Sequence, residues 1–223
     1  MTLEEKRKVM LGAKAWVEKN LLTTFKLTNE SYGKLLIHST IDCFAQMWGS
    51  YPPAGFNCAT FCGFVLRYSS YNTIFKQICP TTLHYHYDKE NPIDLTLGEI
   101  YRWDDVALVS EANRILLNIK DEQLREEAKK KHTYIKLLYQ QRNKLVHELD
   151  NIGTKIEFNN DVPSIASGMD INGKYIWTLN YPRKWLYNLA EETIFNFIDD
   201  CMHKEKRLRF LDKERTIDLT WYV

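Results

Sequence analysis

The sequence predicts a mainly α-helical fold: a helical bundle with a small β-hairpin inserted before the last long helix. Apolar residues recur every three or four positions over most of the chain, which is the period of a helix that buries one face. Only 9 Gly and 6 Pro interrupt the 223 residues, so long stretches contain no helix breaker. The exception is Asn172-Gly173, because this dipeptide between alternating segments favours a two-residue hairpin turn.

Three amphipathic helices are expected in the first third of the chain. The first covers residues 3–21, the second runs from a cap at residue 28 or 29 to residue 48, and the third covers residues 57–71. The apolar positions expected on their inner faces are Met10, Ala13, Trp16, Val17 and Leu21, then Tyr32, Leu35, Leu36, Phe44 and Trp48, then Phe61, Phe64, Val65 and Tyr68.

The middle of the chain changes from irregular to strongly helical. Residues 79–96 contain prolines and histidines without a clear period, and we expect an irregular segment there. Residues 97–149 are rich in Glu, Lys, Gln and Leu, which are strong helix formers. A break at residues 121–123 would divide this stretch into two helices, and Gly153 suits the end of the second.

A hairpin and one more helix complete the chain, which we expect to form a single domain over residues 1–223. The hairpin insertion covers about residues 154–180, with alternating segments at 155–158 and 169–177. Pro182 suits the first turn of a final helix, because its missing N–H has no partner there in any case. The tail is expected to add a short strand or helix. The buried stripe expected on the final helix is Leu186, Leu189, Ala190, Thr193, Ile194, Phe197 and Cys201.

Composition and charge narrow the class of protein. The formal net charge is +1, from 30 basic and 29 acidic residues, which argues against a basic surface that coats DNA. A local cleft that meets one or two phosphates stays possible. No apolar run reaches the ~18 residues of a membrane helix, and the charged N terminus lacks the apolar core of a signal peptide. We therefore expect a cytoplasmic protein that contacts no membrane.

The helix expected at residues 131–149 carries a cation within its apolar face. At about 100° per residue Arg142 falls in the middle of the stripe, while Asn143 and His147 share one edge of it. A guanidinium is costly to bury alone, so an anion must meet it or the stripe must open into a cleft. Pairing with a buried carboxylate, or reaching the surface past Tyr139, would satisfy it equally. The apolar members of the stripe are Ile135, Leu138, Leu145 and Leu149.

The segment Arg142-Asn-Lys-Leu-Val-His147 resembles the signature of the HEPN superfamily, in which a polar residue follows an Arg and a His lies four to six positions after it. The aromatic-rich segment 61–68 is similar to a helix that often precedes the catalytic segment in that superfamily. The resemblance implies an HEPN-like helical bundle and a metal-independent endoribonuclease without a cofactor. RNA is then the substrate, cleaved between the two copies of a homodimer. A bacterial toxin or defence effector, controlled by an antitoxin or regulatory protein, is the implied role.

The same resemblance implies a role for each motif residue. His147 would be the general acid and base, since an imidazole pKa of ~6.5 suits proton transfer in either direction. Arg142 would clamp the phosphate with its planar fork, and Asn143 would orient the imidazole or the phosphate. Lys144 in the motif and Lys131 in the basic run before it are the candidate substrate-binding residues.

Two other interpretations of the motif remain open. A catalytically inactive HEPN-like module would bind RNA or a partner protein without cleaving, and a structural protein would use Arg142 to close a buried ion pair. In one branch of the superfamily, toxins paired with a small nucleotidyltransferase carry a Tyr two residues after the His. Leu149 stands at that position, so regulation by that route is not expected.

Metal-ligating residue types give weaker signals. His84 and His86 would share one side of a strand and could hold a metal with Asp88 or Glu90, but an aromatic surface cluster is the favoured interpretation. The five cysteines contain no C-x-x-C pair, so we expect buried thiols rather than a zinc site or a disulfide framework.

Overall fold

The protein is mainly helical and contains a small antiparallel sheet, which confirms this part of the predicted fold class. The structure, a computed structural model, describes residues 1–26, 30–49, 57–148, 161–169 and 175–212. Its contacts group the chain into two compact units, residues 1–70 with 186–223 and residues 71–185. Whether the chain folds as a single domain over residues 1–223 stays a prediction.

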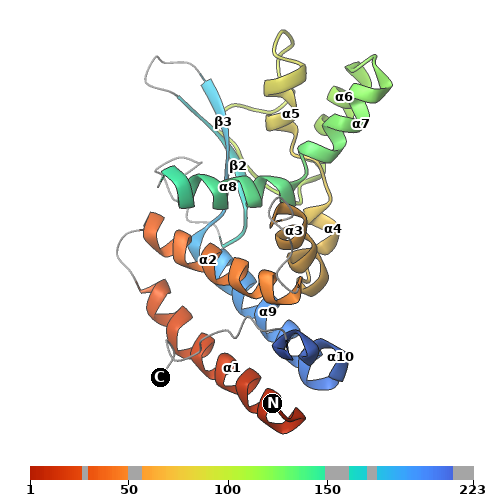
Figure 1. Cartoon of the computed structure of the whole chain (residues 1–223). Coiled ribbons are helices and arrows are strands. Elements are labelled where there is room, and N and C mark those ends of the chain that lie inside the picture. Colours follow the sequence, from red (N-terminus) through yellow and green to blue (C-terminus); the bar gives the residue numbers. More distant parts are fainter. Residues whose placement is uncertain (27–29, 50–56, 149–160, 170–174, 213–223) are drawn as a thin grey trace. The chain divides into compact units, whose positions relative to one another are not determined.

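In its described part the first unit consists of helices. They are α1 (Leu3–Phe25), α2 (Glu30–Trp48), α3 (Asn57–Tyr68), α10 (Glu205–Leu208) and the short 3₁₀ turn η1 (Arg209–Asp212), together with most of α9 (Arg183–His203). Helix α1 contacts α2, and α2 contacts α3 (Figure 1). The tail therefore continues as a short helix in its described part, which is one of the two expected forms.

The inner faces of α3 and α9 follow the predicted spacing. Every residue of the predicted α9 stripe has a side chain with an exposed fraction of 0%. On α3 the four predicted apolar residues are all buried. The Phe197 ring meets Phe64 and Tyr68 edge to face, with centroid distances of 5.6 and 5.5 Å. These aromatic contacts join α3 to α9 and form the core of this unit.

The predicted inner face of α2 is confirmed at Phe44, which is buried, but is wrong in the first half of the helix. Tyr32 and Leu36 are exposed, whereas Lys34 and His38 are buried. The Lys34 side chain has an apolar stem, and its ammonium group pairs with the carboxylate of Glu30 one turn earlier. A sequence pattern that counts Lys and His as polar therefore assigns this helix face incorrectly.

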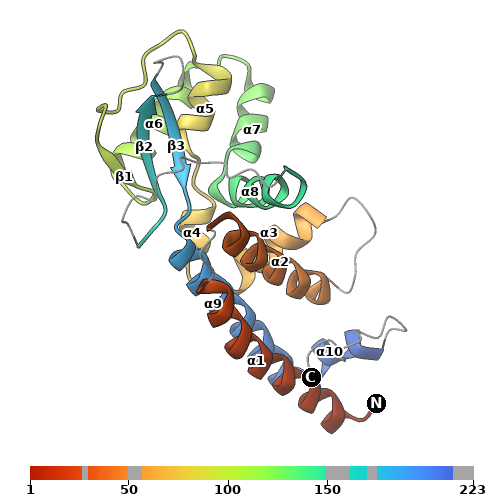
Figure 2. The same cartoon turned by 90° about the vertical axis from the view of Figure 1, so that its left-hand side faces the viewer.

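The second unit combines helices with the sheet. Its helices are α4 (Asn72–Phe75), α5 (Pro80–Tyr87), α6 (Val106–Asn118), α7 (Glu122–Lys131) and α8 (Tyr134–Glu148). Its strands β1 (Ile100–Arg102), β2 (Ser164–Met169) and β3 (Tyr175–Asn180) pair antiparallel in the order β1-β2-β3, with β2 in the middle (Figure 2).

The predicted hairpin is present as β2 and β3, directly before α9. Met169 pairs with Tyr175 near the turn, and Ser164 pairs with Asn180 at the far end. The turn dipeptide Asn172-Gly173 and the expected strand at residues 155–158 lie outside the described residues. The position of the hairpin thus follows from its sequence signal. A two-residue turn at Asn172-Gly173 would pair residue 169 with residue 176, so the observed register differs from that expectation by one residue.

The expected continuous helix from residue 97 is wrong in its first part. Gly98 has a φ of 86°, which a helix does not allow, and the chain then forms β1. The N–H of Trp103 donates to the carbonyl of Pro163 at 3.0 Å, which ties the end of β1 to the start of the hairpin. Helix α6 begins only after Asp105, whose carboxylate accepts from the N–H of Ala107 at 2.9 Å.

Two further boundaries separate helices in this region. The expected break at residues 121–123 is confirmed, because the Asp121 carboxylate caps α7 by accepting from the N–H of Leu124 at 2.8 Å. A second break at His132 was not expected. There the carbonyl of His132 accepts from the N–H of Cys79 at 2.9 Å, and the N–H of Tyr134 donates to the carbonyl of Gln77 at 3.0 Å. A distant segment of the chain therefore interrupts the helical stretch.

The expected irregular segment at residues 79–96 is wrong at its start, where α5 forms. Pro80 occupies the first turn of α5, a position where proline fits a helix well. Within α5 the side chains of Thr81 and Leu83 are buried. The proline that suggested an interruption is therefore a helix start.

Trp103 is the centre of the aromatic core of the second unit. Its side chain has an exposed fraction of 1%. The rings of five other residues surround it at centroid distances between 5.0 and 6.5 Å; they are Tyr71, Phe75, Tyr134, Tyr181 and Trp185. This cluster joins β1, α4, α8 and the end of β3 around one indole ring.

Within the described ranges, each helix is either too short or too polar to traverse a lipid bilayer.

We predict that Trp103→Ala lowers the free energy of unfolding by about 3 to 5 kcal/mol, because it leaves a large cavity among rings that cannot close over it. Urea unfolding followed by circular dichroism measures the change. The matched control is Leu117→Ala on α6, where the side chain is 77% exposed, and its effect should stay within about 0.5 kcal/mol. Equal losses for both variants would contradict a core role for Trp103.

Candidate functional site

Helix α8 carries the motif, and its position is set at its first residue. The N–H of Tyr134 donates to Gln77, and the phenol of Tyr181 donates to the carbonyl of Tyr134 at 2.9 Å. The predicted apolar stripe is confirmed for the described side chains, since Ile135, Leu138 and Leu145 are buried. The fourth member of the stripe, Leu149, lies outside the described residues.

Arg142 and Asn143 form one polar pair on α8. The Nη1 atom of Arg142 donates to Oδ1 of Asn143 at 3.0 Å, and the guanidinium carbon lies 5.8 Å from the centroid of the Tyr139 ring. Both side chains are half-buried. The amide of Asn143 therefore contacts the guanidinium, and its expected role in orienting the imidazole or the phosphate stays a prediction.

The third motif residue is near the end of the same helix. Position 147 belongs to α8, but the side chain of His147 lies outside the part of the chain that the structure describes. An offset of five residues places positions 142 and 147 about 140° apart around a helix.

The two candidate substrate-binding lysines are not brought together. Lys144 is exposed on α8, and its offset of two residues from Arg142 places the two positions on opposite sides of the helix. Lys131 ends α7, before α8 begins, and its ammonium group pairs with the carboxylate of Glu127, which raises the pKa of Lys131. Ten residues of helix separate Tyr134 from Lys144, or about 15 Å along the axis. Of the two lysines, only Lys144 lies on the same helix as the motif.

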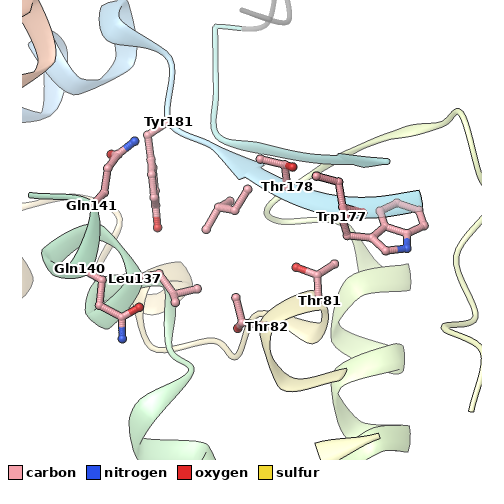
Figure 3. Close-up of a pocket in the computed structure, with 10 residues that line it drawn as sticks. Thr81, Thr82, Leu137, Gln140, Gln141, Trp177, Thr178 and Tyr181 are labelled. Carbon is pink, nitrogen blue, oxygen red and sulfur yellow. The ribbon is translucent and has the colours of Figure 1, made fainter. Parts of the chain in front are cut away.

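A pocket of about 310 Å³ lies beside α8 within the second unit. Its walls come from three elements: Leu137 and Gln140 of α8, Thr81 and Thr82 of α5, and Trp177 of β3 with neighbouring strand residues. Tyr181, just after β3, closes one end. Figure 3 shows Leu137 and Tyr181 on one side of the pocket, Trp177 on the other, and Thr81 and Thr82 rising from α5. The helix that carries the motif thus also lines the pocket.

Sequence reasoning missed this pocket because its walls are far apart in the chain. The threonines belong to a segment expected to be irregular, and Trp177 was assigned only to a hairpin. The one local signal is the spacing of Leu137, Gln140 and Gln141, which share a face of α8 at offsets of three and four residues. That signal alone does not distinguish a pocket wall from an ordinary helix surface.

The metal alternative at His84 and His86 loses its geometric basis. Both residues lie on α5 rather than on a strand, and an offset of two residues places them on opposite sides of a helix. In the described ranges no three His, Cys, Asp or Glu side chains are arranged to hold a metal ion. All five cysteines are free, and three of them are buried as expected; Cys43 is exposed and Cys58 is half-buried.

His132 is a buried histidine next to the pocket. Its Nδ1 atom and the hydroxyl of the pocket residue Thr82 are joined by a hydrogen bond of 3.2 Å. The ring of His86 lies 5.1 Å from its own. Burial, with smaller contributions from His86 and Lys131, lowers the pKa of His132 to about 4. The imidazole is therefore neutral near pH 7 and adds no charge beside the pocket.

Comparison with protein-family models, with curated proteins and with solved structures finds no match to this chain.

We predict that acid destabilises the protein partly through His132. The pKa of His132 is about 4 in the folded chain, whereas its ordinary value is 6.5. The unfolded chain therefore binds the proton more readily, and the free energy of unfolding falls as the pH drops from about 6.5 to about 4. Protonation of His132 lowers the free energy of unfolding by at most about 3 kcal/mol. Urea unfolding at pH 7 and pH 4.5 should show a smaller difference for His132→Gln than for the unchanged chain. An identical difference in both proteins would exclude His132 as a source of acid sensitivity.

Proposed function

We propose that this protein is a metal-independent endoribonuclease of HEPN type that acts as a homodimer in the cytoplasm, as a toxin or defence effector. The observation that carries this proposal is the hydrogen bond of 3.0 Å from Arg142 to Asn143 on α8. It supports the proposal because a neighbouring amide holds the planar guanidinium in a defined orientation. Exposed Lys144 adds a second cation on the same helix, on the side opposite Arg142.

The reaction follows from the chemistry of RNA and of these side chains. The 2′-oxygen attacks the adjacent phosphorus and the bond from phosphorus to the 5′-oxygen breaks, which yields a 2′,3′-cyclic phosphate and a 5′-hydroxyl. His147 takes the proton from the 2′-hydroxyl, and the imidazolium formed in this way gives a proton to the departing 5′-oxygen. Arg142 donates to the non-bridging oxygens, on which negative charge accumulates in the transition state.

The homodimer is part of the proposal because of the helical offset between the two residues. Positions 142 and 147 lie about 140° apart on α8, so one copy does not turn both toward a single phosphate by backbone position alone. A two-fold axis near the motif would pair Arg142 of one copy with His147 of the other. An antitoxin or regulatory protein that covers the interface between the two copies would keep the enzyme inactive.

A module that binds RNA without cleaving it is the second candidate. The pocket beside α8 favours it, because its described walls offer aromatic, hydroxyl and amide groups and contain no His, Asp or Glu for proton transfer. Both candidates predict RNA binding, and only the first predicts the loss of intact RNA.

We predict that His147→Ala slows RNA cleavage by about 100-fold or more, because proton transfer by a positioned side chain contributes on that scale. The assay incubates a mixed pool of single-stranded RNA with the full chain in EDTA and separates the products on a gel. His203→Ala is the matched control, since His203 is an exposed histidine of α9, and it should cleave at the original rate. Absence of cleavage by the unchanged protein, or cleavage that survives His147→Ala, would overturn the enzymatic proposal.

We predict complementation between two inactive variants. A mixture of Arg142→Ala and His147→Ala chains forms heterodimers in which one of the two shared sites contains both native residues. If half of the dimers are mixed, the mixture should regain about a quarter of the original activity. The same cleavage assay measures this after the chains are unfolded and refolded together. If the mixture remains as inactive as either variant, the two residues do not act across a dimer interface.

A further inference from the structure

The pocket beside α8 has walls suited to a flat, uncharged ligand. Among the described residues that line it, none carries a formal charge, and Trp177 and Tyr181 contribute aromatic rings. Hydroxyl groups come from Thr81, Thr82 and Thr178. Planar rings with hydrogen-bonding edges bind to proteins through these two kinds of contact, stacking on aromatic side chains and bonding to polar groups at their edges.

One end of the pocket is rigid before any ligand arrives. The Tyr181 side chain has an exposed fraction of 2%, and its phenol donates to the carbonyl of Tyr134 at 2.9 Å. Its ring stacks on Trp185 at 5.6 Å between centroids, with 28° between the planes. The other end carries the half-buried Trp177, whose ring lies 6.3 Å from that of Tyr101. A ligand that enters therefore meets aromatic surfaces already ordered, which lowers the entropy cost of binding.

The size of the pocket limits the ligand to about one base. A volume of about 310 Å³ is at the lower end for ligand pockets, which suits a single ring system and not a dinucleotide. The uncharged walls also disfavour a phosphate or carboxylate inside, because a buried anion needs a cation or several donors. The phosphate of a nucleotide would have to remain outside the pocket.

Helix α8 provides a cation for that external phosphate. Leu137 and Gln140 line the pocket, and Lys144 lies one turn beyond Gln140 on the same face of the helix. Both Gln140 and Lys144 are exposed, so the face from the pocket edge to Lys144 is open to solvent. A nucleic-acid backbone lying along this face would pass from the pocket to Lys144 and on toward position 147.

We propose that this pocket binds one unpaired nucleobase of a single-stranded RNA while the attached backbone follows α8 toward the motif. The inference rests on the proposed function and adds the way in which the substrate is held. It commits to single-stranded RNA, because a base inside a duplex is stacked and paired and cannot enter a pocket without being extruded. Base binding next to the motif would select which phosphate is cleaved.

The test uses oligonucleotides that cannot be cleaved. Fluorescence anisotropy measures binding of the full chain to a labelled single-stranded 2′-O-methyl octamer, and to versions in which one residue at a time lacks its base. Loss of the base at one position should weaken binding about 5-fold to 150-fold, the range found for stacking of one base on aromatic side chains. Equal binding of all versions would overturn the proposal.

Two variants test whether the weaker binding of an octamer that lacks one base comes from the pocket. Leu137→Trp places an indole in the pocket beside α8. This variant should bind the complete octamer as weakly as the octamers that lack a base, so its preference for the complete octamer should disappear. Leu117→Trp is the matched control, because it adds the same indole to a residue of α6 that is 77% exposed, and its preference should be unchanged. A Leu137→Trp protein that folds and still prefers the complete octamer would place the base elsewhere.

A measurement on the unchanged protein covers the case in which Leu137→Trp does not fold. Octamers with 4-thiouridine are cross-linked by light, and mass spectrometry locates the attached peptide. The expected attachment is to Trp177 or Tyr181, and attachment confined to other peptides overturns the proposal. Free nucleosides are titrated as competitors, and one that binds as tightly as the octamer would assign the pocket to a soluble metabolite instead.

The outcomes separate this inference from the proposed enzyme. A protein that distinguishes the octamers but leaves RNA intact supports the base site and overturns the nuclease. A protein that cuts RNA but binds all octamers equally supports the nuclease and overturns the base site. A protein that neither binds nor cuts RNA overturns both.

Discussion

The hydrogen bond from the Tyr181 phenol to the carbonyl of Tyr134 joins the end of the hairpin to the start of the motif helix. Both side chains are almost fully buried, so neither group has water as an alternative partner. Burial also raises the pKa of both tyrosines well above the usual range, which keeps the Tyr181 phenol protonated as a donor. The pocket exists between β3 and α8 because this contact and the ring cluster around Trp103 hold the two elements at a set distance.

Helix α8 carries the guanidinium of Arg142 within its apolar face. Arg142 lies within the arc between Leu145 and Ile135, both of which are buried. The amide of Asn143 and the ring of Tyr139 accompany its guanidinium. These groups lie on the same helix as Arg142, so their arrangement depends on local spacing and survives small shifts of the surrounding elements. The pocket depends instead on three elements that meet only after folding.

Elements with one strong local signal could be predicted from the sequence. The stripe on α9 and the cap at Asp121 follow from periodicity and from a carboxylate before a helix. The hairpin follows from Asn172-Gly173 and the alternation around it. Predictions failed where a distant contact competed with local preference. Residues 77–79 bond to the backbone on both sides of Thr133 and interrupt a run of good helix formers. The error on α2 has a local cause instead, because the ammonium group of buried Lys34 pairs with Glu30 one turn earlier, which no hydropathy pattern shows.

The amino-acid sequence by itself determined that the chain is mainly helical, where its hairpin lies, and that Arg142, Asn143 and position 147 occupy one helix. These properties depend on interactions between residues a few positions apart, which a sequence displays directly. Only the tertiary structure decided that Lys131 and Lys144 lie on different helices and that Thr81, Leu137 and Trp177 surround one pocket. Those relations depend on how separate elements pack, because burial and side-chain contacts between distant segments arise only when the chain has folded.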